Sequence, residues 1–159
     1  MTLDAIDTAL IDILREDARI SINALADRAN ISRSNAYARL HRLTEAGVIR
    51  GFTVRTDPIR EGYHTSAYVA LSIDQSEWKP IRQRLTALPE VRHIALVGGE
   101  FDVLTLVRAR DNQDLRRVVL QEMQAIPGVR SSRTFLVFED LDTPTPSPRL
   151  ASTSASGSP

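Results

Sequence analysis

The stretch IALVGGEFDVLTLV, from Ile94 to Val107, decides the fold of the larger part of this chain. Two apolar runs flank a glycine pair at 98–99, which is followed by Glu100 and Asp102. This pattern is typical of two antiparallel strands joined by a tight turn. The same glycines would also leave backbone N–H and C=O groups accessible to a small polar molecule. A plain hairpin and a binding pocket therefore both stay open.

The segments on either side of this stretch predict a sheet with two helices. The motif LPEVR at 88–92 returns as IPGVR at 126–130, and each copy ends a helix and starts a strand. Proline just past each helix explains why both helices stop there. We expect an α+β fold, a ferredoxin-like βαββαβ sandwich over 65–140. Its strands are expected at 65–73, 91–98, 101–109 and 129–138, and its helices at 77–88 and 112–126.

The first 55 residues predict a separate (winged) helix-turn-helix domain. Asp4, Ser21 and Ser32 can each cap one of three short helices, the last of which runs to about Ala46. Residues 48–55 alternate like a strand and could form a wing. Residues 56–64 (TDPIREGYH) read as a linker, and 141–159 as a disordered tail rich in proline and serine.

Charge is distributed unevenly, although the chain carries no net charge. Residues 1–27 contain six acids and two arginines, whereas residues 28–55 contain six arginines and one acid. A basic block beside an acidic one gives one face a positive potential. A merely solvated, charged surface would have the same composition.

The third helix, SRSNAYARLHRLTEAG, has the pattern of a DNA-recognition helix. Ala36, Leu40 and Leu43 can pack inward, so the opposite face is free for double-stranded DNA. A plain three-helix bundle with a charged face is the alternative. Contacts with bases are predicted for Arg33, Ser34, Asn35 and Ala38, contacts with phosphates for Arg39, Arg42 and Arg50, and further DNA contacts for Ser32 and Tyr37.

Taken together, residues 1–140 resemble the Lrp/AsnC (feast/famine) transcriptional regulators. No single motif carries the resemblance; the order of the two domains and the Gly-Glu-Phe-Asp turn make it specific. The chain departs from the family at Ala36, where a larger β-branched residue is usual. The positions that carry it in the first domain are Leu3-Asp4, Asp7, Leu10, Ile13-Leu14, Ala18-Arg19, Leu25-Ala26, Ile31-Ser32, Arg39-Leu40, Leu43, Gly47-Val48-Ile49 and Gly51-Phe52.

The resemblance implies that a small effector binds near the glycine turn, between dimers. The matching residues are Val97, Gly98, Gly99, Glu100, Phe101 and Asp102. A neighbouring subunit is expected to contribute from around 130–134. An amino acid suits this turn, because the carboxylates can accept from an ammonium group and the backbone N–H groups can bind a carboxylate. The resemblance further implies tetramers, octamers or similar rings of dimers.

The strand pattern independently predicts a homodimer. Both faces of the strands at 101–109 and 129–138 are apolar, and two helices can cover only one face. The same sheet from a second copy would cover the other.

The motifs and composition exclude several classes of protein. There is no cysteine, the three histidines are scattered, and no nucleophile elbow or phosphate loop is present. We therefore expect no enzyme, no catalytic residues, no metal and no cofactor. No apolar run spans a bilayer, so a cytoplasmic protein without a membrane partner is expected. Nineteen arginines against one lysine favour a GC-rich bacterial genome.

These observations predict a sequence-specific transcriptional regulator that responds to an amino acid or related metabolite. The first alternative is an effector-independent, nucleoid-associated protein that organises DNA with little sequence preference. The second is an enzyme built on the sandwich, since that fold also hosts enzymes.

Overall fold

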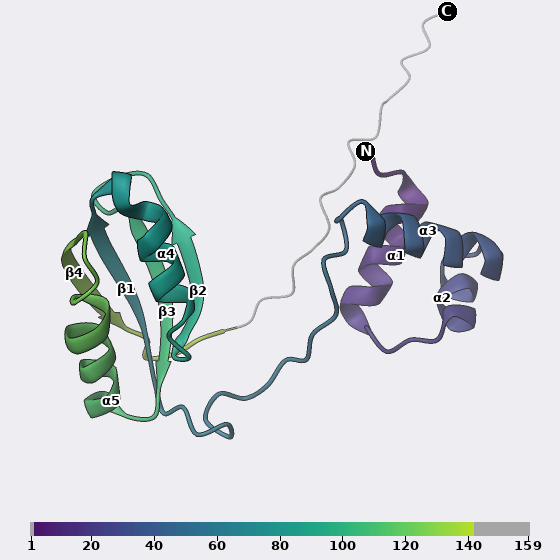
Figure 1. The fold of residues 1–159 in the computed structure, drawn as a ribbon. Coiled ribbons are helices and arrows are strands. Elements are labelled where there is room, and N and C mark those ends of the chain that lie inside the picture. Colours follow the sequence, from purple (N-terminus) through teal and green to yellow (C-terminus); the bar gives the residue numbers. More distant parts are fainter. Residues whose placement is uncertain (1, 142–159) are drawn as a thin grey trace, which may run out of the picture. The chain divides into compact units, whose positions relative to one another are not determined.

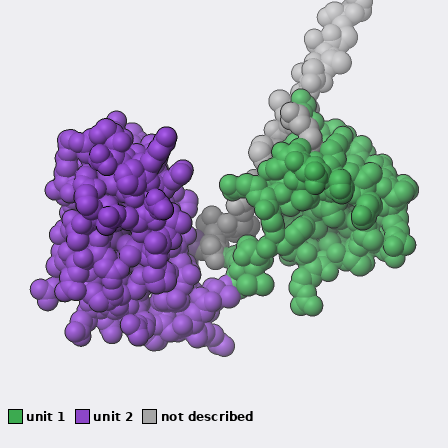
Figure 2. Space-filling model, in the orientation of Figure 1, with its two compact units in different colours: residues 1–55, 143–159 green, residues 56–142 purple. Residues whose placement is uncertain are grey.

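The computed structural model describes residues 2–141, which form two compact units divided between Arg55 and Thr56 (Figure 2). The first unit holds helices α1 (Ala5–Glu16), α2 (Ile22–Arg28) and α3 (Arg33–Glu45) (Figure 1). The predicted tail at 141–159 lies outside the described residues apart from Leu141.

All three helices of the first unit begin at the predicted caps. The side chains of Asp4, Ser21 and Ser32 each accept a hydrogen bond from the backbone N–H three positions later, at 2.8, 3.2 and 3.2 Å. Each bond satisfies one of the N–H groups that a helix start leaves without a partner. The capping at α1 is reciprocal, because the Asp7 carboxylate accepts from the backbone N–H of Asp4 and completes a capping box.

Apolar side chains from the three helices close a small core. Leu10, Leu25 and Leu43 are fully buried or nearly so, and Ala36 turns its small side chain into the same interior. Each fully buried leucine contributes roughly 1.5–3 kcal/mol relative to an exposed one. The inward face predicted for α3 is thereby confirmed at Ala36 and Leu43, while Leu40 is half-buried.

The link between α2 and α3 has four residues, Ala29 to Ser32, as a helix-turn-helix requires. Asn30 adopts a left-handed backbone with φ of 53°, which asparagine tolerates better than most residues. The N–H of Ile31 donates to the carbonyl of Ala26 at 3.0 Å and closes the turn. Gly47 ends the α3 region with φ of 69°, as predicted from its position.

The strand predicted at 48–55 is not formed in this chain. Residues 50–57 carry no regular secondary structure, and Phe52 and Val54 are 55% and 79% exposed. Alternating residues become a strand only when a neighbouring strand supplies a hydrogen-bonding ladder. No described segment of the first unit provides that ladder, so the prediction of a wing strand was wrong for the single chain.

The second unit contains an antiparallel sheet of the strands β1 (Thr65–Ile73), β2 (Val91–Leu96), β3 (Val103–Ala109) and β4 (Val129–Leu136). The strands lie in the order β2-β3-β1-β4. This order is the ferredoxin-like βαββαβ topology that the sequence predicts. Around the glycine turn, the strand expected at 91–98 ends at Leu96 and the strand expected at 101–109 begins at Val103, because residues 97–102 form the connection between them. The helical elements of this unit are η1 (Gln75–Glu77), α4 (Trp78–Thr86), α5 (Asn112–Arg117) and η2 (Val118–Met123).

The helices α4, α5 and η2 pack against one face of the sheet (Figure 1). A single α-helix predicted over 112–126 is instead an α-helix that widens into the π-helical turn η2. The N–H of Gln124 donates to the carbonyl of Val119, five residues earlier, at 3.0 Å. This wider turn lets Val118, Val119 and Met123 all reach the core.

The opposite face of the sheet carries apolar side chains that no helix covers. Tyr68 and Phe135 lie opposite each other on β1 and β4 and are 39% and 47% exposed. Leu104 and Leu106 of β3 are half-buried on the same face. We call these four residues the open sheet face.

Residues 56–64, predicted as a linker, make contacts with the second unit. The N–H of Tyr63 donates to the carbonyl of Pro58 at 2.8 Å, which folds this segment into a turn. The Arg92 guanidinium of β2 lies over the Tyr63 ring, 4.7 Å from its centre. This cation–π contact fixes the entry of the chain into the sheet.

Candidate nucleic-acid interface and ligand turn

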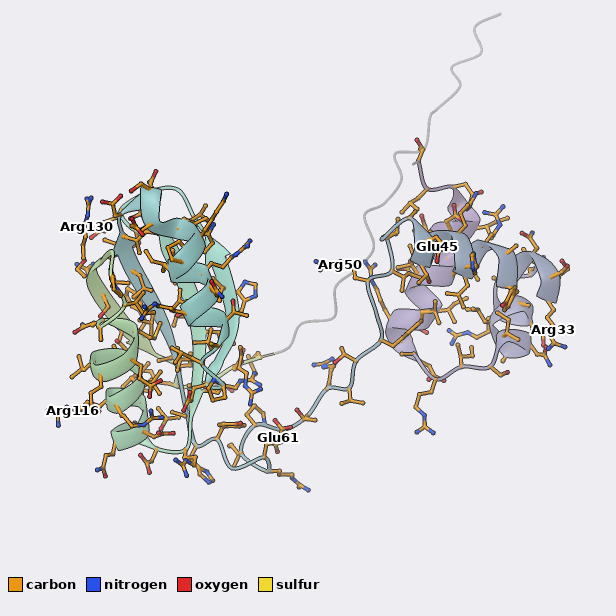
Figure 3. The ribbon with its side chains drawn as sticks, in the orientation of Figure 1. Arg33, Glu45, Arg50, Glu61, Arg116 and Arg130 are labelled. Atoms are coloured by element: carbon orange, nitrogen blue, oxygen red, sulfur yellow. The ribbon has the colours of Figure 1, made fainter. Side chains whose placement is uncertain are left out.

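Helix α3 presents a broad exposed face at the surface of the first unit. Arg33 projects from its N-terminal end, and Glu45 lies at the other end (Figure 3). The inward residues Ala36 and Leu43 fix the rotation of the helix and so decide which side chains reach solvent. The predicted contact residues that are exposed here are Ser32, Arg33, Ser34, Asn35, Tyr37, Ala38 and Arg42, and Arg50 is exposed in the segment after α3.

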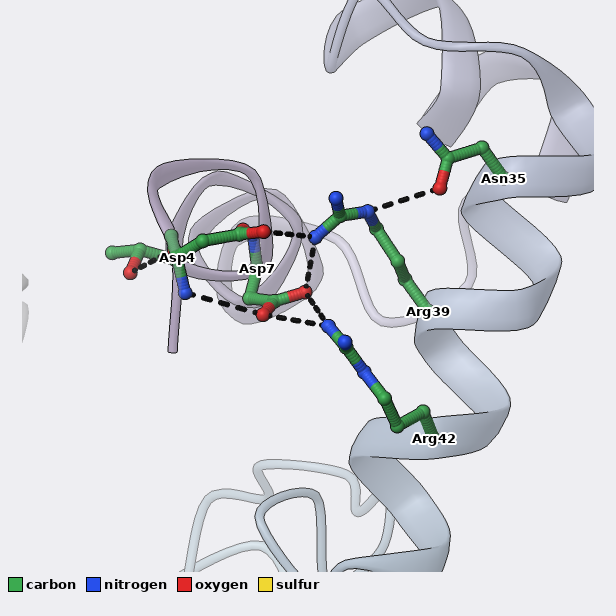
Figure 4. Close-up of polar contacts among 6 residues, drawn as sticks. Asp4, Asp7, Asn35, Arg39 and Arg42 are labelled. Carbon is green, nitrogen blue, oxygen red and sulfur yellow. Dashed lines mark hydrogen bonds and ion pairs between the residues drawn. The ribbon is translucent and has the colours of Figure 1, made fainter. Parts of the chain in front are cut away.

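One flank of α3 is tied to the start of α1 through a buried carboxylate. Asp7 is 1% exposed and accepts from Arg39 Nη1 at 2.8 Å and from Arg42 Nη2 at 2.7 and 2.8 Å (Figure 4). Asp4 accepts from the same Arg39 nitrogen at 2.6 Å. We call Asp4, Asp7, Arg39 and Arg42 the acid–arginine cluster. Its role is to hold the exposed helix in one orientation, because charged hydrogen bonds are short and directional.

The charges of this cluster reinforce one another. The N–H of Asp7 and the Arg39 guanidinium hold the pKa of Asp4 below its ordinary value. Hydrogen bonds to Asp4 and then Asp7 raise the pKa of Arg39. Arg39 and Asp4 therefore stay charged over a wider pH range than they would alone.

Arg39 and Arg42 both have a hydrogen-bond partner within the protein. Both were predicted to contact phosphates, and that remains a prediction, but each already has a carboxylate partner within the protein. Arg39 is only 19% exposed, whereas Arg42 is 51% exposed. The sequence predicted Asp4 as a helix cap and indicated nothing for Asp7 beyond its place in the family resemblance. The excess of acid in residues 1–27 beside the arginine-rich α3 was the signal that could have paired them.

The other flank of α3 borders an apolar groove in the first unit. Tyr37 and Leu40 form one wall, and Leu14, Ile20 and Phe52 contribute to the rest. Tyr37 is 65% exposed and lies along this groove rather than in the core. The outermost stripe of α3, between the two flanks, holds Ser34 and Ala38, whose small side chains permit close approach to a flat or grooved surface.

The predicted ligand turn connects β2 to β3. The N–H of Val97 donates to the carbonyl of Asp102 at 2.8 Å, which closes the turn. Gly99 has φ of 133°, a left-handed conformation that favours glycine. Glu100 is exposed, with Oε1 3.4 Å from Arg133 Nη1, and the Arg133 guanidinium lies 5.2 Å from the centre of the Phe101 ring. The structure thus brings together the turn and the 130–134 segment within one chain.

Asp102 anchors this turn to the sheet. Its carboxylate accepts from the backbone N–H of Ile73 at 2.9 Å and from Gln75 Nε2 at 2.8 Å. The hydrogen bond from Gln75, and next the one from the Ile73 N–H, lower the pKa of Asp102. Since both oxygens already have protein donors, Glu100 is the better placed carboxylate for a ligand. The sequence did not predict a role for Gln75, because no local pattern marks a contact 27 positions away.

Residues 2–141 hold neither a cluster of metal ligands nor a membrane-spanning helix. No group of three histidine or acidic side chains in this part of the chain is placed to hold a metal ion. No helix described there is both long and apolar enough to span a bilayer.

Two family models match the chain along nearly all of its described length. The Lrp/AsnC ligand binding domain matches residues 66–146, and a winged helix-turn-helix DNA-binding domain matches residues 3–50. The chain belongs to the Lrp/AsnC family. The resemblance drawn from the sequence is therefore confirmed, as is the α+β fold.

Relatives of this Lrp/AsnC protein are regulators of transcription. An HTH-type transcriptional regulator of Pyrococcus abyssi is 36% identical over 135 residues, covering 85% of each protein. The regulator AldR of Mycobacterium tuberculosis is 34% identical over 142 residues, 87% of this chain and 79% of the relative. The crystal structure of the leucine response regulatory protein LrpA of Mycobacterium tuberculosis covers 89% of this chain and 96% of its own, with a TM-score of 0.78 and 32% identity.

These matches establish the broad function. The chain is a DNA-binding transcriptional regulator with a ligand-binding domain, and not an enzyme. The relatives include archaeal as well as bacterial proteins, so a bacterial source remains a prediction from the arginine content.

Proposed function

We propose that this Lrp/AsnC protein binds a specific DNA sequence in the cytoplasm and changes its binding in response to an amino acid or a closely related metabolite. The observation that carries the proposal is the exposed face of α3. Arg33, Ser34, Asn35 and Ala38 stand on it, on a helix whose rotation is fixed by buried Ala36 and Leu43. The first residues of such a helix meet base edges in the major groove.

A mobility-shift titration of the full chain on its own promoter DNA tests the DNA interface. Arg33→Ala is expected to weaken binding about tenfold, the usual cost of losing one arginine–base contact. Arg60→Ala is the matched control, because Arg60 is 88% exposed in the second unit. Equal affinities for the two variants would contradict the placement of DNA on α3.

The effector is proposed to bind at residues 97–102. Glu100 supplies an exposed carboxylate for an ammonium group, and the glycine pair leaves backbone N–H groups accessible. The related LrpA protein is named for a response to leucine, which supports an amino acid as the effector class. A binding screen would identify the individual effector.

A thermal-shift screen of the twenty amino acids and related keto acids is the direct test. A ligand at 100 times its dissociation constant stabilises the native state by roughly 2.7 kcal/mol. Glu100→Ala is expected to abolish the shift, whereas Glu61→Ala, an exposed glutamate elsewhere in the second unit, should retain it. The absence of any shift at millimolar ligand would favour an effector-independent DNA organiser instead.

The assembly is proposed to be a homodimer, with further association of dimers into tetramers or octamers. The open sheet face is an apolar surface that a second copy can cover through a two-fold axis. Two α3 helices in one dimer could then enter successive major grooves about 34 Å apart.

A further inference from the structure

Asn35 combines exposure with a fixed side-chain orientation. It is the third residue of α3, on the surface proposed to meet DNA. A free asparagine reads adenine with both ends of its amide, because the oxygen accepts from adenine N6 and the amino group donates to N7. Which end of Asn35 faces outward therefore decides which base it can read.

Arg39 settles the orientation of the Asn35 amide. Arg39 Nε donates to Asn35 Oδ1 at 3.0 Å, one helical turn away (Figure 4). A guanidinium has donors only, so the group that faces it must be the amide oxygen and not the amino group. The assignment follows from chemistry, because the reversed amide would place donor against donor.

Arg39 is in turn unable to swing away freely. Its Nη1 donates to Asp4 at 2.6 Å and to the buried Asp7 at 2.8 Å, and its side chain is 19% exposed. A line of hydrogen bonds therefore runs from α1 through Arg39 to Asn35. Among residues 2–141 the Asn35 amino group has no hydrogen-bond partner, so its two N–H donors remain available (Figure 4).

We propose that Asn35 is a specificity-determining residue that reads guanine through its amino group, with Arg39 as its positioning residue. Guanine presents two acceptors in the major groove, N7 and O6, whereas adenine presents one acceptor beside an N6 donor. A donor-only group is matched by guanine and opposed by the adenine amino group. This inference rests on the proposed sequence-specific binding and goes further by naming the base class.

The test is selection of binding sites from a random duplex library by the full-length chain, followed by titration of single-base variants of the selected site. The wild-type chain should show one position where guanine is preferred over adenine by roughly tenfold. Asn35→Ala should lose the preference at that position alone. Asn35→Asp presents acceptors only, so it should shift the preference to a base with an amino group, cytosine or adenine.

Two arginine variants separate positioning from general stability. Arg39→Met removes the donor that holds the amide oxygen, so the same position should come to accept adenine. Arg42→Met is the matched control, since Arg42 also binds Asp7 but is not bonded to Asn35. It should leave the base preference unchanged, whatever its overall affinity. A merely structural role would weaken all sequences equally in both variants.

The outcomes keep this inference distinct from the proposed function. If the chain enriches no sequence over bulk duplex, the proposed sequence-specific binding fails. If it enriches a site but Asn35→Ala relaxes no position, or adenine is preferred where Asn35 acts, sequence-specific binding stands and the role of Asn35 is overturned. A guanine preference of the wild-type chain that changes in Asn35→Asp and Arg39→Met as described supports both the proposed function and the role of Asn35.

Discussion

Asp7 ties helix α3 to the start of α1 through hydrogen bonds to two arginines. Its carboxylate is 1% exposed and binds two arginines of α3 as well as the backbone start of α1. A buried carboxylate is tolerated in a small core only because charged donors surround it. A change at Asp7 therefore removes a partner from Arg39 and Arg42 at once.

We predict that Asp7→Asn lowers the free energy of unfolding of the first unit by roughly 2–4 kcal/mol. Urea unfolding followed by far-ultraviolet circular dichroism measures the loss. Asp12→Asn is the matched control on the same helix, because the Asp12 side chain is 39% exposed. Trp78 is the single tryptophan and lies in the second unit, so its fluorescence transition should not move. Equal stability of the two asparagine variants would contradict the importance of the buried carboxylate.

The lowered pKa of Asp102 makes a second prediction at the scale of a residue. A carboxyl whose pKa is lower in the folded than in the unfolded state stabilises the fold above the unfolded pKa, and the stabilisation is lost as pH falls through the folded one. The melting temperature of the second unit should therefore drop on acidification below about pH 4. Asp102→Asn should show a shallower drop over this range than the wild-type chain, and an equal drop in the two proteins would contradict the stabilising role of the Asp102 carboxylate.

The turn before β4 requires glycine at position 128. Gly128 has φ of 90°, and a Cβ there would lie 2.9 Å from Glu77 Cβ and 3.0 Å from Ile81 Cδ1. Its carbonyl also accepts from the N–H of Asp74 at 2.7 Å, which joins the ends of β1 and β4. Any residue other than glycine at position 128 would therefore suffer both backbone strain and a close contact with Glu77 and Ile81.

Gly128→Ala is expected to destabilise the second unit by roughly 1–3 kcal/mol. Gly98→Ala is the comparison, because Gly98 has no positive φ and nothing lies within 4 Å of its would-be Cβ. Chemical unfolding followed by Trp78 fluorescence measures both variants. If alanine at 98 proved as costly as alanine at 128, the steric account of Gly128 would be wrong.

At the scale of the whole molecule, the open sheet face is the surface on which assembly is expected to depend. Phe135 and Leu136 are neighbours on β4 with nearly equal exposure, 47% and 48%, but they point to opposite faces of the sheet. Phe135 lies beside Tyr68 on the open face, whereas Leu136 pairs with Ala67 on the helix-covered side. The two positions therefore form a matched pair.

We predict that Phe135→Glu converts the proposed dimer to a monomer, whereas Leu136→Glu leaves it a dimer. The buried charge would have no partner in a packed interface and would cost several kcal/mol. Sedimentation equilibrium of both variants at the same concentration measures the mass. A dimer that survives Phe135→Glu but not Leu136→Glu would place the interface on the other side of the sheet.

The sequence alone determined most of the helices and strands and their order along the chain. Capping residues such as Ser32 act on N–H groups three positions away, and strand alternation is a property of neighbouring residues, so both can be read locally. The repeated LPEVR and IPGVR motifs likewise marked where two helices end. The exposed face of α3 followed from the same local periodicity, which is why most of its candidate DNA contacts are exposed in the structure.

The tertiary structure decided which polar side chains are already engaged. Arg39 meets Asp7 across 32 positions and Gln75 meets Asp102 across 27, and no periodicity links residues so far apart. Packing of α3 on α1 gives Arg39 and Arg42, both predicted to contact phosphates, a buried carboxylate partner within the protein. The strand expected at 48–55 failed for the same reason, since alternation can propose a strand but only a neighbouring chain segment can supply its hydrogen bonds.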